Sequence, residues 1–123
     1  MIKTRNLTKK FGNTIAVNKL NLNIPAGEIF GFVGPNAAGK TTTIKMLSGL
    51  LLPTSGTVDI CGIDLIKNSK QAKKIIGLVP DNPFLYMKLT ALEYLNFIGD
   101  IYDIPFKIRE ERINFYLNLF KIE

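Results

Sequence analysis

The feature that most constrains this chain is the stretch "GPNAAGKTTT" at 34–43, which directly follows the apolar run "EIFGFV". Gly34, four residues, Gly39, Lys40 and Thr41 match the P-loop pattern G-x-x-x-x-G-K-T. The glycines let the backbone turn so that consecutive N–H groups converge on one point. A helix beginning at Lys40 adds unpaired N–H groups and a positive dipole end. The stretch therefore predicts a strand–loop–helix unit that holds phosphate.

The side chains that end the pattern indicate a nucleoside triphosphate with a metal ion. Lys40 supplies a mobile charge for the β- and γ-phosphates, and the Thr41 hydroxyl is an oxygen ligand for Mg²⁺. The alternative is an ordinary turn between a strand and a helix. We expect Mg²⁺ and a nucleoside triphosphate as the ligands of this loop.

The absence of histidine from the 123 residues excludes several kinds of chemistry. Catalytic triads that use imidazole and histidine metal clusters cannot form in this chain. The single cysteine, Cys61, cannot form an internal disulfide, and its neighbours "VDICG" predict a reduced, buried thiol in a strand.

The charge balance is basic, with 16 Lys and Arg against 10 Asp and Glu, a formal net charge of +6. The cations are dispersed, and no nucleic-acid-binding motif accompanies them, so a solvated surface explains most of them and no nucleic acid is expected as a partner. The sequence contains neither a long apolar run nor a signal-peptide pattern, which favours a cytosolic location. A chain of this length forms one domain at most.

Alternation of apolar and polar residues predicts an antiparallel edge sheet. The alternating segments are 2–7 and 19–24, and Gly12 and Asn13 lie between them at a predicted turn. A third strand is expected at 56–62.

Two continuously apolar segments predict buried strands. The first, 28–34, suits a central strand covered on both faces, and the second, 75–80, is stopped by Pro80. Because the chain offers few parallel strands, 28–34 is expected to lack neighbours on one side.

Helical patterns account for the rest of the chain. A helix from Lys40 to near Gly49 and a short polar helix at 68–74 are expected. Thr90 and Glu93 form a predicted capping box before a helix that ends near Pro105, and a second helix follows it. These two helices are expected to pack on each other through Leu92, Leu95, Ile98, Tyr102, Ile113, Leu117 and Phe120.

The segment "GPNAAGKTTTIKMLSGLLLPTSGTVDICGIDL" resembles the ATP-binding cassette (ABC) ATPases, in which the P-loop helix precedes a "GLLxPTSGxVxxxG" segment. The upstream "NLTKKFGNTIAVNKLNLNIPAGEIFGFVGPN" looks like the opening strands of that family, and "IIGLVPDNPFLYMKLTALEYLNF" is similar to the region leading into its helical subdomain. The resemblance implies an α/β fold of the P-loop NTPase type, present in part. Residues 1–86 would form the antiparallel edge sheet and nucleotide-binding core, and 87–123 would begin the helical subdomain.

The resemblance also assigns roles to individual residues. Phe11 would stack on the adenine of ATP, and the α-phosphate would meet Thr42. Asn36 and Ala38 would contribute backbone N–H groups. A core aromatic at a strand end is the alternative for Phe11.

Two positions depart from the family pattern. Ala37 stands where glycine is usual, and if the backbone needs a positive φ there, its Cβ costs about 1 kcal/mol and weakens binding. Asp81 stands where glutamine is usual, in the loop that senses the γ-phosphate. A carboxylate there is a candidate Mg²⁺ ligand, and the alternative is a turn-forming residue in "VPDNP".

The motifs that complete hydrolysis in this family do not occur in the sequence. These are the "LSGGQ" signature, the Walker B strand with its glutamate, and a switch histidine. We therefore expect no catalytic residue in this chain, and ATP binding without turnover.

The resemblance implies an ATP-binding subunit of a membrane transporter. Such a subunit is cytoplasmic, lies peripherally on the membrane, contacts a transmembrane permease through residues 81–103, and forms a homo- or hetero-dimer of ATP-binding modules. Two alternatives stay open: a non-catalytic nucleotide-binding or interaction module, and an ABC protein of translation or DNA repair.

Overall fold

The computed structural model describes residues 1–83 and 85–122. The chain forms two compact units, Met1–Leu78 and Val79–Glu123. The resemblance implies a different division, between a nucleotide-binding core at 1–86 and the start of a helical subdomain at 87–123, and that division stays a prediction. The two compact units are described separately.

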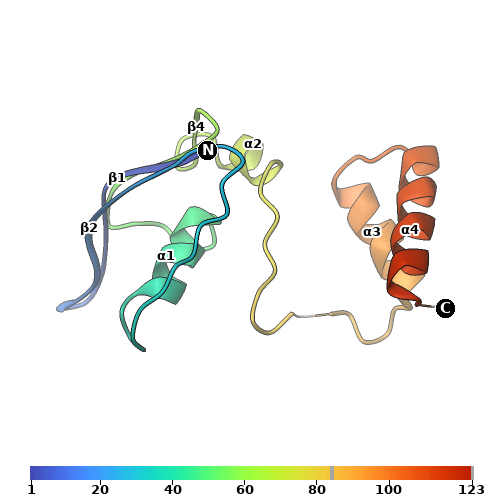
Figure 1. Ribbon diagram of the computed structural model, residues 1–123, viewed down its shortest axis with the longest axis horizontal. Coiled ribbons are helices and arrows are strands. Elements are labelled where there is room, and N and C mark those ends of the chain that lie inside the picture. Colours follow the sequence, from blue (N-terminus) through green and yellow to red (C-terminus); the bar gives the residue numbers. More distant parts are fainter. Residues whose placement is uncertain (84, 123) are drawn as a thin grey trace. The chain divides into compact units, whose positions relative to one another are not determined.

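The first unit is built on an antiparallel sheet, of which Figure 1 labels β1, β2 and β4. The strand order of the sheet is β2-β1-β3-β4. Strands β1 (Ile2–Phe11) and β2 (Thr14–Ile24) form a hairpin whose turn lies at residues 12–13, as predicted. Strand β3 (Ser55–Ile60) pairs with the other edge of β1, and the short β4 (Ile63–Asp64) follows it. The predicted edge sheet is therefore confirmed, with longer strands than the alternating segments indicated.

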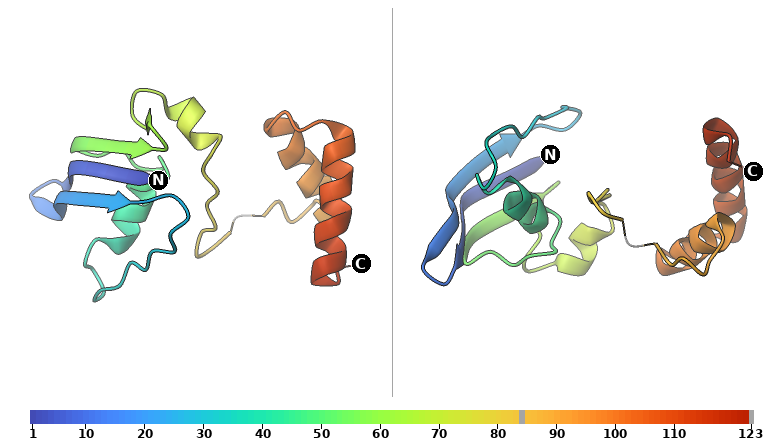
Figure 2. Two further views of the ribbon diagram at one scale, coloured as in Figure 1. Left: turned by 45° about the horizontal axis from the view of Figure 1, so that its top comes forward. Right: turned by 90° about the horizontal axis from the view of Figure 1, so that it is seen from below.

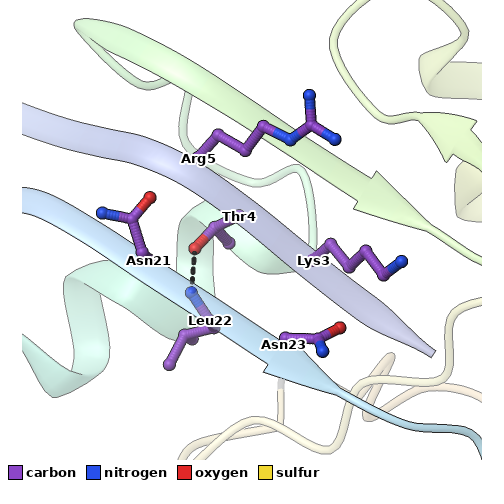
Figure 3. Close-up of a pocket in the computed structure, with 6 residues that line it drawn as sticks. All are labelled: Lys3, Thr4, Arg5, Asn21, Leu22 and Asn23. Atoms are coloured by element: carbon purple, nitrogen blue, oxygen red, sulfur yellow. Dashed lines mark hydrogen bonds between the residues drawn. The ribbon is translucent and has the colours of Figure 1, made fainter.

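The pairing of β1 with β2 is irregular and is held by a side chain. The ladder shifts register between Thr4 and Leu7 and twice more before Phe11. The Thr4 hydroxyl bridges part of this irregularity, because it accepts from the Leu22 amide at 2.9 Å (Figure 3). It also donates to the Leu20 carbonyl oxygen at 2.9 Å. Thr4 is buried, so its polar side chain is satisfied by the neighbouring strand.

Helix α1 (Lys40–Leu47) packs on one face of this sheet (Figure 2). Met46 of α1 is fully buried in the core, which Leu7, Val17, Val58, Ile60, Leu65 and Ala72 complete. Ala72 comes from the short helix α2 (Ser69–Lys73), which the polar segment at 68–74 predicted. Burial of Met46 thus fixes the helix whose first residue is the lysine of the P-loop pattern.

The two predicted buried strands are wrong for this chain. Residues 28–34 and 75–80, all described by the structure, form no strand. Ile29 and Val33 are almost fully exposed, as is Val79. The sheet order β2-β1-β3-β4 includes neither segment, so no neighbouring strand covers them, although Ile76 packs against the core of the first unit.

The prediction for Cys61 is also wrong. Cys61 lies in the turn between β3 and β4, where both Cys61 (φ 52°) and Gly62 (φ 86°) adopt left-handed conformations, and its side chain is exposed. The short return of the chain into β4 ends the strand at Ile60, before the cysteine is reached.

The second unit contains helices α3 (Ala91–Ile101) and α4 (Phe106–Phe120), which lie side by side. The predicted capping box is present: Glu93 N donates to Thr90 Oγ1 at 3.2 Å, and Thr90 N donates to Glu93 Oε2 at 2.8 Å. Among the residues that the structure describes, no helix has the length and apolar character needed to cross a membrane.

The packing between α3 and α4 differs from the predicted set of inward residues. Ile113 is buried, and an apolar groove between the helices is lined by Leu95, Ile98, Leu117 and Phe120, although Phe120 is largely exposed. Leu92 and Tyr102 do not line this groove and are about half exposed. In the described residues of this unit α3 and α4 are the only helices, so one contact surface on each is covered, and the rest of the apolar stripe faces solvent.

Arg109 joins the two helices, a contact that the apolar pattern did not predict. Its guanidinium donates to the carbonyl oxygens of Asn96 and Ile104 at 3.0 Å and pairs with the Asp100 carboxylate at 2.6 Å. Its Nε lies against Gly99, the one buried residue of α3. Glycine leaves room there for the arginine to cross the helix.

Candidate functional site

The loop before α1 has two left-handed residues, Ala37 (φ 64°) and Gly39 (φ 79°). Gly39 is the N-cap of α1 and makes no side-chain cap hydrogen bond, so the first amides of the helix keep their donors for another partner. A turn of this kind next to a helix N-terminus is an anion-binding concavity. The loop and the helix therefore have the geometry that the P-loop pattern predicts, whereas the strand predicted before them is absent from the described residues 28–34. The condition set for strain at Ala37 is met.

Gly39 is held in place by strand β2. A Cβ on this residue would lie 2.3 Å from the Ala16 carbonyl oxygen and 3.1 Å from a Val17 methyl group. Only glycine fits both the left-handed backbone and this close approach. The contact ties the loop to the sheet and fixes where its amides point.

Lys40 folds back over the loop. Its Nζ donates to the carbonyl oxygens of Gly34 and Pro35, at 2.5 Å each. An ammonium group has three protons, so one remains for a ligand oxygen. The charge predicted to meet the phosphates is thus held at the mouth of the loop by the loop's own backbone.

The three threonines of α1 have different surroundings. Thr43 is buried, and its amide donates to the Gly39 carbonyl oxygen at 2.8 Å. Thr42 is half-buried, whereas Thr41 is exposed at the first turn of the helix. Thr41 is therefore accessible as the predicted Mg²⁺ ligand, and Asn36 and Ala38 are exposed within the loop.

Phe11 lies at the end of the β1–β2 hairpin, with about half of its side chain exposed. It pairs with Thr14, and Ala16 two residues further on is the residue that contacts Gly39. At about 3.3 Å per strand residue, this separation is about 7 Å along β2, within the reach of a nucleotide whose phosphates occupy the loop. Phe11 and the residue that contacts Gly39 thus lie at the same end of the hairpin, and the stacking role of Phe11 stays a prediction.

Sequence reasoning missed Lys9. Its Nζ lies 5.2 Å from the centre of the Phe11 ring and donates to the Leu52 carbonyl oxygen at 2.8 Å. The spacing of two residues on one strand places both side chains on the same face and could have indicated the contact.

Asp81 belongs to the other compact unit and is exposed. Its predicted role as a metal ligand stays a prediction.

The ABC transporter family model matches residues 17–123 of this chain. The chain therefore belongs to the ABC transporter family. Its fold is the α/β fold of the ABC-type P-loop ATPases, present in part, as predicted.

Curated relatives are ATP-binding proteins of transporters. The chain is 48% identical over 95 residues to the bacitracin transport ATP-binding protein BcrA of Bacillus licheniformis, covering 77% of this chain and 31% of that protein. It is 40% identical over 114 residues to the probable multidrug ABC transporter ATP-binding protein YbhF of Escherichia coli (strain K12), covering 93% of this chain and 20% of that protein. The chain thus spans about a third or less of the length of these relatives.

Solved structures give the same result. An ATP-binding subunit of an ABC transporter aligns with a TM-score of 0.89 at 26% identity, over 99% of this chain and 51% of that one. A bacterial ABC transporter cassette solved as a dimer aligns with a TM-score of 0.81 at 32% identity, over 100% of this chain and 58% of that one.

Proposed function

We propose that this chain is the ATP-binding part of an ABC transporter subunit that binds Mg-ATP through the loop between Gly34 and Thr42. The observation that carries the proposal is the left-handed turn at Ala37 and Gly39 followed directly by the uncapped N-terminus of α1. Such a turn collects backbone donors for the phosphates, Lys40 adds a positive charge, and the exposed Thr41 hydroxyl holds Mg²⁺ when the metal is bound. Phe11 then receives the adenine ring.

The partner that we propose for this subunit is a transmembrane permease. The relatives are named as transport or multidrug transporter proteins, and a structural relative was solved as a dimer, which supports a pair of ATP-binding modules beside the permease. The exposed apolar residues of 85–97, among them Leu85, Tyr86 and Met87, fit the proposed permease-facing segment within 81–103. Such a subunit lies on the cytoplasmic face of the membrane.

For the 123-residue chain alone we propose binding without turnover. The "LSGGQ" signature and histidine do not occur in its sequence, and none of its carboxylates is placed as a water-orienting base by the sequence pattern. A non-catalytic nucleotide-binding module is the second candidate, and it is favoured by the strained Ala37 at a position where the family usually has glycine.

The test is calorimetric titration of the chain with ATP and Mg²⁺. We expect one site, and Lys40→Ala should weaken binding about tenfold or more, the size of a hydrogen bond to a charged group. Lys45→Ala removes a charge from the same helix and should leave the affinity nearly unchanged. Equal affinities of wild type and Lys40→Ala would contradict the proposal.

Phosphate release from the same samples separates binding from hydrolysis. No steady turnover is expected. Steady turnover that Lys40→Ala abolishes would refute the non-catalytic part of the proposal and leave nucleotide binding intact.

A further inference from the structure

Lys9 and Phe11 lie two residues apart at the end of β1, and the ammonium group of Lys9 covers one face of the Phe11 ring. The distance from Lys9 Nζ to the ring centre is 5.2 Å. A cation over an aromatic face is attracted by the electrons of the ring, and about 6 Å is the limit at which this attraction is felt. The contact is therefore a cation–π pair at the residue proposed to receive the adenine.

The ammonium is fixed from the other side as well. Lys9 Nζ donates to the carbonyl oxygen of Leu52 at 2.8 Å, across a sequence separation of 43 residues. Leu52 lies in the segment that leaves the C-terminal end of α1, the helix whose N-terminus follows the P-loop. Lys9 thus connects the aromatic ring to the same piece of structure that carries the phosphate-binding residues.

A half-exposed phenylalanine at a hairpin end would otherwise change rotamers freely and would lose that freedom when a base stacks on it. The ammonium over one face favours one orientation of the ring, and the exposed half of the Phe11 side chain stays accessible to a flat ligand. Lys9 is placed to act on the base through Phe11.

We propose that Lys9 is a positioning residue for the nucleobase: it orients Phe11 so that one ring face is presented for stacking. This inference rests on the proposed function, because it concerns the base-binding end of the same ATP site. A plain attraction between Lys9 and the phosphates is the competing explanation, and the two differ in whether the effect depends on the base.

The experiment compares two ligands of the 123-residue chain, Mg-ATP and inorganic tripolyphosphate with Mg²⁺, which carries the phosphates without the base. Lys9→Met should weaken Mg-ATP about two- to fivefold, the size of an exposed cation–π contact, and leave the tripolyphosphate affinity unchanged. Lys9→Arg keeps both the charge and the donor for Leu52 and should restore the Mg-ATP affinity. Lys10→Met, the same charge change on the neighbouring residue, should affect the two ligands equally and slightly.

The outcomes distinguish this inference from the proposed function. If the wild-type chain binds neither ligand, the proposed function fails and this inference fails with it. If Mg-ATP binds but Lys9→Met shifts both affinities alike, or neither, only the positioning role is overturned.

A second measurement tests the contact itself. The side-chain methylene protons of Lys9 nearest the ammonium should show NMR shielding from the Phe11 ring, and Phe11→Leu should abolish that shielding. If the Lys9 methylene protons had the same chemical shifts in the wild type and in Phe11→Leu, and both proteins were folded by circular dichroism, the inference would be overturned.

Discussion

The carbonyl oxygen of Ala16 lies so close to Gly39 that a Cβ on the glycine would come within 2.3 Å of it. This contact links β2 to the loop before α1 and explains why the second glycine of the P-loop pattern is needed for packing as well as for backbone conformation. Packing and backbone conformation each contribute to the cost of replacing Gly39, and the two contributions to stability are measurable separately.

Gly39→Ala should destabilise the first unit by about 2–4 kcal/mol, because left-handed strain and overpacking add. Gly27→Ala is the matched control: Gly27 has nearly the same φ (81° against 79°), and nothing within 4 Å of its added Cβ. It should cost only about 1 kcal/mol. Hydrogen exchange of the β1–β2 amides measures both, and equal costs would contradict the packing role of Gly39.

Bound phosphates would hold residue 37 in its left-handed conformation, whereas the free loop is able to leave it, so the strain of about 1 kcal/mol from the alanine Cβ opposes binding. Ala37→Gly should therefore tighten Mg-ATP binding about two- to fivefold, because the flexibility of glycine offsets part of the gain. Ala38 is outside the set of left-handed residues, so Ala38→Gly should weaken binding or leave it unchanged. Calorimetric titration distinguishes the two variants. If Ala38→Gly bound Mg-ATP more tightly than the wild type and Ala37→Gly did not, the assignment of the strain to residue 37 would be wrong.

Gly99→Ala should destabilise the second unit although alanine favours helix by about 1 kcal/mol over glycine. The new Cβ would lie 2.5 Å from Arg109 Nε and would displace the guanidinium from its helix-joining contacts. In an Arg109→Met background the same change should be stabilising, because only the propensity remains. All four tyrosines, at 86, 94, 102 and 116, lie in this unit, so tyrosine fluorescence during urea unfolding reports its stability selectively. If the effects of Gly99→Ala and Arg109→Met on stability were additive, the coupling between these two residues would be contradicted.

Glu93 should make the second unit sensitive to acid. Hydrogen bonds from the Thr90 backbone and then its side chain lower the pKa of the Glu93 carboxyl below 4.5. A carboxyl with a lowered pKa contributes stability above its unfolded pKa, and that contribution is lost as pH falls through the folded pKa. The difference in urea midpoint between wild type and Glu93→Gln should therefore be largest above pH 4.5 and shrink at lower pH. Glu111→Gln corrects for the general charge effect, and a constant difference across the range would contradict the assignment.

Local signals allowed much of the fold to be predicted. The Gly12 turn, the capping box at Thr90 and Glu93, and the start of α1 at Lys40 each depend on residues next to one another in the sequence. The apolar runs 28–34 and 75–80 were assigned wrongly because a buried strand depends on neighbouring strands, which the described residues do not supply. The apolar pattern of a segment indicates which side chains it is able to bury, but it does not indicate whether a neighbouring strand is present to cover them.

In the candidate site, too, contiguous patterns were predictable from the sequence and contacts between distant residues were not. The loop residues were predicted because a P-loop is a contiguous pattern, and the positive φ of Ala37 follows from its place in that pattern. Lys9 at the site, and likewise Arg109 between α3 and α4 of the second unit, were missed because their partners, the Leu52 carbonyl oxygen and Gly99, become neighbours only after folding. Hydrogen bonds from lysine or arginine to distant backbone carbonyls leave no apolar pattern in the sequence, although the two-residue spacing of Lys9 and Phe11 could have indicated the ring contact.

Titration of the ¹⁵N-labelled chain with Mg-ATP, followed by the amide resonances, tests the central claim most directly. The account predicts saturable shifts that are largest at the amides of residues 37–42 and that Lys40→Ala strongly weakens. Unshifted resonances at these amides in millimolar Mg-ATP, from a chain that is folded by circular dichroism, would contradict it.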